Sequence, residues 1–207
     1  MGNRAVITTR ENFKNNGVGV YLHWNGGRDS VSAFLKYCEL KGYRSPDSDC
    51  YGWARLCQVI ANFFGGSTSI GIDMVNKLDC NGDNGVYIIE GWKIADRENA
   101  PSHEQDTWDM SEMLAGIDKA QPEAEQLGGY LTAKEIPTEE LKTGDTVYIQ
   151  KWDGTVSKHT VVGFGEDKFV NGTNVKNIPF VDAYGDGKYD CNINNYIRTK
   201  TARVETE

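Results

Sequence analysis

The hydrophobic pattern of this 207-residue chain changes across residues 122–137. Before that segment, stretches with helical spacing of apolar residues are mixed with strand-like stretches. After it, short strand-like runs are separated by turn sequences such as Asp153-Gly154 and Asn171-Gly172. The pattern predicts an α+β protein with an N-terminal α+β domain over 1–121, an acidic linker over 122–137 and a small antiparallel β domain over 138–207. An SH3-like barrel is one architecture that this last pattern fits.

Within the first domain, the spacing predicts the element order ββααββα. In the second strand, one face is expected to be buried and carries Val18, Val20, Leu22 and Trp24. The opposite face carries Gly19, Tyr21 and His23. Caps and glycines predict where the helices begin and end. The expected strands are 4–9, 18–24, 70–74 and 86–94, with a turn at 15–17, and the expected helices are 29–41, 50–64 and 106–120.

Negative charge is concentrated in the middle of the chain. The whole chain has a net charge of −8, and residues 95–141 hold twelve acidic and three basic residues. Direct binding to bare nucleic acid normally requires the opposite sign, so we expect no direct DNA binding. A solvated helix face and linker would explain the charge, and so would a surface for a basic partner protein.

Composition and cysteine usage indicate a soluble globular protein of the host cytoplasm. The sequence shows no apolar run near the length of a membrane span and no pattern of a secretory signal, so we expect no membrane partner. Its five cysteines lack a Cys-x-x-Cys pair, and the oxygen-rich loops at 79–85 and 182–190 lack the spacing of an EF-hand. We therefore expect free thiols, no metal site and no cofactor.

The strongest candidate for a working surface is the N-terminal cluster of Arg4, Tyr21 and His23. The two strands that carry these residues are expected to bring them together near the start of a helix. Arg4 and His23 have the chemistry to contact a phosphate or carboxylate, and an imidazole can carry a proton near neutral pH. The alternative is structural: His23 packs against Trp24 or caps a turn, and Arg4 pairs with Asp29 or Glu90.

The same segment resembles a group of uncharacterised phage and mobile-element proteins. Those proteins open with Met-Gly-Thr-Arg-Ser and continue to Tyr-x-His-Trp-Asp-Gly-Tyr-Pro before a helix. The resemblance covers about the first fifth of this chain, and it implies a mobile-element origin more than an activity. The matching residues are Gly2, Arg4, Tyr21, His23, Trp24 and Gly26, and the differences are Asn3, Ala5, Asn25, Gly27 and Arg28.

A second resemblance is to cell-wall cysteine peptidases of the NlpC/P60 type. In those enzymes a cysteine opens a helix and a histidine lies on a later strand, as Cys50 and His159 are expected to do here. A helix N-terminus stabilises a thiolate, and a histidine can activate it. The long gap between the two residues and Tyr51 in place of a small serine depart from that family.

Acidic residues on and after the third helix form the candidate partner-binding surface, with an aromatic anchor among them. We expect a non-enzymatic inhibitor of a host nucleic-acid-targeting defence enzyme, of anti-CRISPR or antirestriction type, that contacts a basic, nucleic-acid-binding partner. The alternatives are a small hydrolase or nuclease that uses His23 and Arg4, and an adaptor whose β domain binds peptides through Tyr148 and Trp152. The expected surface comprises Glu104, Asp106, Trp108, Asp109, Glu112 and Asp118.

Overall fold

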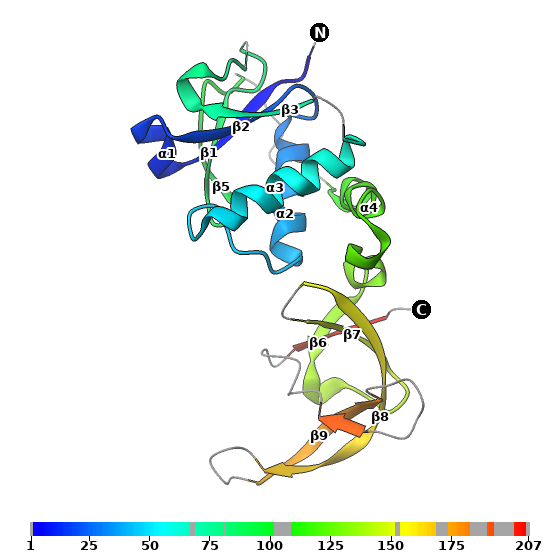
Figure 1. The fold of residues 1–207 in the computed structure, drawn as a ribbon. Coiled ribbons are helices and arrows are strands. Elements are labelled where there is room, and N and C mark those ends of the chain that lie inside the picture. Colours follow the sequence, from blue (N-terminus) through cyan, green and yellow to red (C-terminus); the bar gives the residue numbers. More distant parts are fainter. Residues whose placement is uncertain are drawn as a thin grey trace. The chain divides into compact units, whose positions relative to one another are not determined.

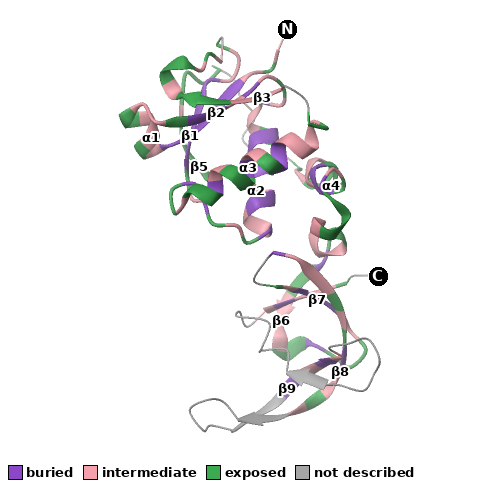
Figure 2. Ribbon diagram, viewed as in Figure 1, coloured by how far each residue is buried: buried purple, intermediate pink, exposed green. Residues whose placement is uncertain are grey.

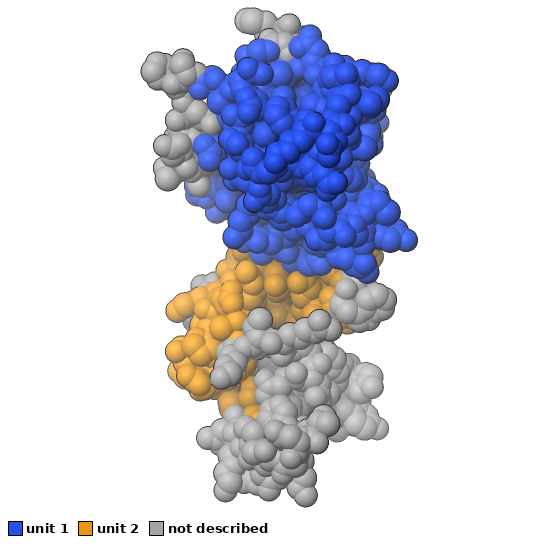
Figure 3. All heavy atoms as spheres, turned by 90° about the vertical axis from the view of Figure 1, so that its left-hand side faces the viewer, with its two compact units in different colours: residues 1–123 blue, residues 124–207 orange. Residues whose placement is uncertain are grey.

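The computed structural model has an α+β fold and divides into two compact units, Met1–Glu123 and Ala124–Glu207 (Figure 3). Among the helices that the structure describes, none is long and apolar enough to cross a bilayer. The residues described are 2–66, 69–80, 82–101, 109–151, 154–168, 174–182, 190–192 and 201–205.

A five-stranded sheet with the order β3-β2-β1-β4-β5 forms the centre of the first unit (Figure 1). Strands β1 and β4 pair in parallel, and the other neighbours pair antiparallel. The central position of β1 explains its complete burial. The strands are β1 (Ala5–Thr9), β2 (Val18–Leu22), β3 (Ile70–Met74), β4 (Val86–Glu90) and β5 (Lys93–Glu98).

Three helices lie on the same side of this sheet in Figure 1: α2 (Arg28–Leu40), α3 (Cys50–Phe63) and α4 (Ser111–Lys119). Each of the three contacts the other two. Burial of their apolar stripes against the sheet forms the core, which Figure 2 shows in purple along the strands and α2. Fully buried core residues include Ile7, Val20, Leu22, Phe34, Leu56, Ile60, Tyr87, Ile89 and Ile117.

Two features of the first unit differ from the sequence prediction. A short helix, α1 (Arg10–Asn15), separates β1 from β2, because the Thr9 side chain caps it and Asn16 ends it in the left-handed conformation. The expected single strand over 86–94 is two strands, β4 and β5, because the chain turns at Gly91 with a φ of 61°. The order is therefore βαβααβββα.

The second unit contains a six-stranded sheet with the order β10-β9-β8-β7-β11-β6, and every described pair in it is antiparallel. Within the described residues, β10 and β6 are the two edges and do not pair with each other. Its core includes Leu141, Val147, Ile149, Val161, Val181 and Ala202. The strands are β6 (Lys134–Pro137), β7 (Thr146–Gln150), β8 (Val156–Lys168), β9 (Asn174–Asp182), β10 (Asp190–Asn192) and β11 (Thr201–Val204).

A polar cluster fixes the end of β11 in this sheet. Glu205 accepts hydrogen bonds of 2.7 Å from the Tyr148 hydroxyl and from the Lys158 ammonium. The bonds from Lys158 and Tyr148 hold the pKa of Glu205 below its usual value. Residues 122–137, the expected linker, contain two short 3₁₀ helices, Glu123–Glu125 and Gly128–Leu131, followed by β6.

Candidate functional site

The N-terminal cluster lies where β2 ends and the chain turns toward α2. The Asn3 amide donates to the His23 carbonyl, and the His23 amide donates to the Ser69 carbonyl, so main-chain pairing extends beyond β2 on both sides. The turn that follows is held by Gly26, whose carbonyl accepts the Tyr87 hydroxyl at 2.9 Å. A Cβ at Gly26 would lie 2.6 Å from the Asn3 carbonyl oxygen, so this close approach requires glycine.

Tyr21 and His23 are brought together by the alternation of side chains along β2. The Tyr21 hydroxyl and His23 Nδ1 are 3.0 Å apart, and both side chains are half-buried. If the phenol donates this hydrogen bond, the imidazole carries its proton on Nε2. Trp24 packs edge-on against the His23 ring at 5.1 Å between centroids and is 44% exposed. The cluster thus combines a hydrogen-bonded imidazole with an exposed indole.

Arg4 lies at the same end of the sheet. Its amide donates to Asp83 at 3.1 Å, and its carbonyl accepts from Asn84, so a loop before β4 fixes its backbone. A Cβ on Gly2 would lie 3.0 Å from Arg4 Nε and 3.1 Å from the His23 carbonyl oxygen. Imidazole, phenol and guanidinium groups at one sheet end are suited to contacting an anion.

The prediction that Asp118 belongs to an exposed acidic surface on the third helix is wrong. This residue is only 5% exposed, and its Oδ1 accepts a 2.7 Å hydrogen bond from the buried hydroxyl of Tyr37 in α2. Burial, followed by the hydrogen bond to Asp118, raises the pKa of Tyr37. Asp118 joins α4 to α2 and is not on the surface for a partner.

Asp109 and Glu112 are exposed at the start of α4. Asp109 accepts a 2.8 Å hydrogen bond from the Ser111 amide, and the bonds from Ser111 lower the pKa of the Asp109 carboxyl. A carboxylate at this position is favoured by the free amides of the helix N-terminus. Glu104, Asp106 and Trp108 lie outside the described residues.

Cys50 and His159 belong to different units. Cys50 is the exposed first residue of α3, and the side chain of Asp49 caps that helix. His159 lies in β8, where its Nδ1 is 2.8 Å from the Asp182 carbonyl oxygen and its Nε2 is 2.7 Å from Ser157 Oγ. Both ring nitrogens are thus engaged within the second unit. The cysteine peptidase mechanism stays a prediction.

The peptide-binding alternative for the second unit rested on two aromatic residues. Tyr148 is buried and its hydroxyl bonds Glu205, so its ring belongs to the core of that unit. Trp152 lies outside the described residues. The described part of β7 therefore does not present the aromatic groove that this alternative requires.

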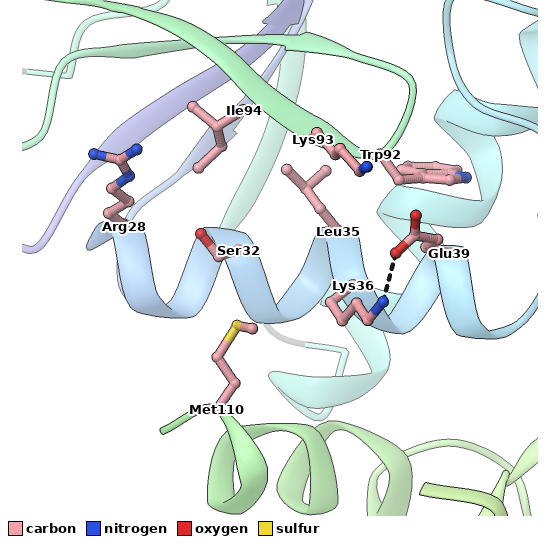
Figure 4. A pocket seen from close by; sticks show the side chains of 9 residues that line it. All are labelled: Arg28, Ser32, Leu35, Lys36, Glu39, Trp92, Lys93, Ile94 and Met110. Atoms are coloured by element: carbon pink, nitrogen blue, oxygen red, sulfur yellow. Dashed lines mark hydrogen bonds and ion pairs between the residues drawn. The ribbon is translucent and has the colours of Figure 1, made fainter. Parts of the chain in front are cut away.

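The structure also contains a groove beside α2 that the sequence did not predict, shown from close by in Figure 4. It has a volume of about 380 Å³. No local sequence pattern marks it, because its lining comes from α2, from residues 92–94 and from Met110, which are far apart in the sequence. The lining residues are Arg28, Ser32, Leu35, Lys36, Glu39, Trp92, Lys93, Ile94 and Met110.

Within the part of the chain that the structure describes, no three His, Cys, Asp or Glu side chains are arranged to hold a metal ion. In the loop at 79–85, Asp83 accepts a hydrogen bond from the Arg4 amide, and Gly85 has a φ of 74°, as in a tight turn.

Comparison of the chain with protein-family models, with curated proteins and with solved structures finds no match.

Proposed function

We propose that this protein is a non-enzymatic accessory protein of a mobile element that inhibits a host nucleic-acid-targeting defence enzyme. Its acidic surface would cover part of the basic surface with which such an enzyme holds phosphates. The observation that carries the proposal is the concentration of twelve acidic and three basic residues in 95–141. The mobile-element origin rests on the resemblance of the N-terminal segment.

Asp109 and Glu112 are the described residues of the acidic surface that a partner can reach. Glu112 lies in α4 and Asp109 lies two residues before it, and side-chain hydrogen bonds attach α4 to its neighbours. Besides the Tyr37–Asp118 bond, the Gln121 side chain donates to the Ile117 carbonyl at 2.9 Å and accepts from Asn62 in α3 at 2.9 Å. A fixed helix presents its charges with little loss of conformational entropy on binding, which supports a role in recognition.

The test is inhibition of plasmid cleavage by a panel of purified restriction nucleases and CRISPR effector complexes. We expect the wild-type protein to slow at least one enzyme, and the variant with Asp109→Lys and Glu112→Lys to lose at least about tenfold in potency. A matched variant, Glu11→Lys with Asp29→Lys, makes the same charge change at exposed sites elsewhere in the first unit. It should inhibit like wild type. Equal potency of all three proteins, or no inhibition of any enzyme, would contradict the proposal.

The hydrogen bond between Tyr21 and His23 favours a second candidate function, that of a small hydrolase or nuclease. In that mechanism, His23 transfers a proton and Arg4 contacts the anionic group of the substrate. Incubation of the protein with RNA, DNA and nucleotides tests it, with His23→Ala compared with wild type. Turnover that disappears in His23→Ala would establish an enzyme and overturn the inhibitor proposal.

A further inference from the structure

Exposed apolar side chains gather at one edge of the sheet of the first unit. Val18 in β2 and Ile72 and Met74 in β3 are all exposed, and Ile72 is 60% exposed. Val18 lies directly opposite Met74, so the three side chains form one stripe on the face of the sheet that also carries the buried Val20. Contiguous exposed apolar side chains of this kind mark an interaction surface.

The main chain of β3 is open at the same edge. Within the sheet formed by the described residues, β3 is an edge strand whose one neighbour is β2. The His23 amide donates to the Ser69 carbonyl, so the odd-numbered residues of β3 bond to β2 and the even-numbered ones turn their main-chain groups outward. The Met74 amide agrees with this alternation, because it donates to the Asp73 side chain at 2.7 Å. The edge of β3 can therefore pair with one more strand.

The two edges of this sheet differ in charge. The opposite edge strand, β5, is rich in charged side chains, which commonly protect an edge strand from pairing with another chain. In β3 the one charged residue is Asp73, whose carboxylate is 3.3 Å from the Lys77 ammonium. The β3 edge is therefore apolar and locally neutral, so it offers no electrostatic preference for a strongly acidic or basic partner. The charged residues of β5 are Lys93, Asp96, Arg97 and Glu98.

The sequence of β3 is complementary to itself, which selects a second copy of this chain as the occupant. When two copies pair antiparallel about Ile72, this residue lies opposite Ile72 of the second copy, and Ile70 lies opposite Met74. The exposed Met74 end of each stripe thus meets the half-buried Ile70 end of the other. On the opposite face Asp73 lies opposite Gly71, so the two carboxylates do not face each other.

We propose that this chain forms a two-fold dimer by antiparallel pairing of β3 with β3 of a second copy. The outward main-chain groups of Ile72 bond each other across the axis, and the two five-stranded sheets become one continuous sheet. The Met74 amide exchanges its bond with Asp73 for one to the Ile70 carbonyl of the second copy. The proposal is independent of the proposed inhibitory function, because it uses neither α4 nor the acidic residues at the start of that helix.

Sedimentation velocity of the full chain at concentrations from about 1 to 300 μM tests the proposal. We expect the mass to rise with concentration toward twice the 23.0 kDa of one chain. Ile72→Lys removes the apolar contact at the axis and places like charges opposite each other, so its dissociation constant should be at least about tenfold higher. Phe164→Lys makes the same charge change at an exposed apolar residue of β8 in the second unit, and it should associate like wild type.

A mixture of Ile72→Lys with Ile72→Glu distinguishes a lost contact from a folding defect. Because this residue faces its own copy, the mixture forms pairs of opposite charge and should associate more tightly than either variant alone. Hydrogen exchange in peptides that cover β3 should slow as the concentration of the wild-type chain rises. A wild-type chain that stays single at every concentration would overturn the proposal in favour of a strand from another protein at this edge. Association that Ile72→Lys leaves unchanged, or a mixture that associates no better than its components, would also overturn it, because the contact would then lie elsewhere.

Discussion

Replacing Tyr37 with phenylalanine removes one buried hydroxyl and leaves the aromatic ring in place. The Tyr37 side chain is fully buried, and its hydroxyl donates a 2.7 Å hydrogen bond to Asp118 across the α2–α4 contact. The substitution therefore tests a single interaction with almost no change in apolar packing. The substitution tests whether this hydrogen bond holds α4 against α2.

The expected cost follows from the burial of the acceptor. Asp118 is nearly inaccessible to water, so water cannot replace the lost donor without a local opening of the structure. A hydrogen bond to a charged group contributes about 1.5–3 kcal/mol to stability. We expect Tyr37→Phe to lower the free energy of unfolding of the first unit by that amount. For a unit of this size, the melting temperature should fall by about 5–10 °C.

Hydrogen exchange at increasing urea concentration, followed by mass spectrometry on peptides from α2 and α4, measures this change in the first unit alone. Tyr51→Phe is the matched control, because Tyr51 is 66% exposed and lies at the start of α3. It should leave the exchange unchanged. If the free energy of unfolding of Tyr37→Phe lies within about 0.5 kcal/mol of that of Tyr51→Phe, the Tyr37–Asp118 bond does not stabilise the fold and the prediction is refuted.

The raised pKa of the Tyr37 hydroxyl predicts that the first unit loses stability at alkaline pH. Burial is the main cause that raises the pKa of Tyr37 in the folded protein above its ordinary value of 10.0. The folded state thus keeps the phenol neutral while the unfolded chain ionises it. The contribution of Tyr37 to stability is complete below pH 10 and is lost progressively as the pH rises beyond it. Tyr37→Phe should remove this part of the pH dependence.

Three further results are expected. Gly85→Ala should destabilise the first unit by more than about 2 kcal/mol in thermal melts, because Gly85 has a φ of 74° and a Cβ there would lie 2.1 Å from a carbonyl oxygen of β5. Gly82→Ala is the control and should cost less, because the space around a Cβ at Gly82 is open. The pKa of Glu205 lies below its ordinary value of 4.5 in the folded protein, so Glu205 stabilises the second unit above pH 4.5 and loses this effect as the pH falls through the lowered pKa. Glu205→Gln should therefore reduce the loss of stability that is measured when the pH is lowered. Iodoacetamide should modify the exposed Cys50 well before the buried Cys38, whose pKa is raised by burial, and mass spectrometry of timed digests measures the order.

Local signals predicted the main elements of the first unit well. The alternation along β2 correctly placed Val20 and Leu22 in the core. It was wrong for Val18 and Trp24, expected on the same face, which are 40% and 44% exposed, because Val18 begins the strand and Trp24 lies beyond its end. The loop at 45–49 offered several possible caps for the second helix, and Asp49 is the residue that caps α3. These features depend on residues that are close in sequence, so periodicity and capping rules are sufficient to find them.

Contacts between distant residues were not predictable in the same way. Asp118 was expected on the surface, because a charged residue on a helix is usually solvated. Its burial depends on Tyr37, which precedes it by 81 residues and whose hydroxyl no spacing rule connects to it. The groove beside α2 was missed for the same reason, since α2 and β5 meet there only in three dimensions. Helix α1 was missed because its caps lie within a stretch that also suits a hairpin turn.

The parallel pairing of β1 with β4 has a consequence for how the protein is made. On a ribosome β1 is synthesised before its parallel partner β4, which follows only after three α-helices and two further strands. Until then, one edge of a strongly apolar strand lacks its native neighbour, and such edges invite association between nascent chains. Synthesis that pauses before Glu90 would therefore favour aggregation, and holding chaperones that shield the nascent segment should raise the yield of folded protein.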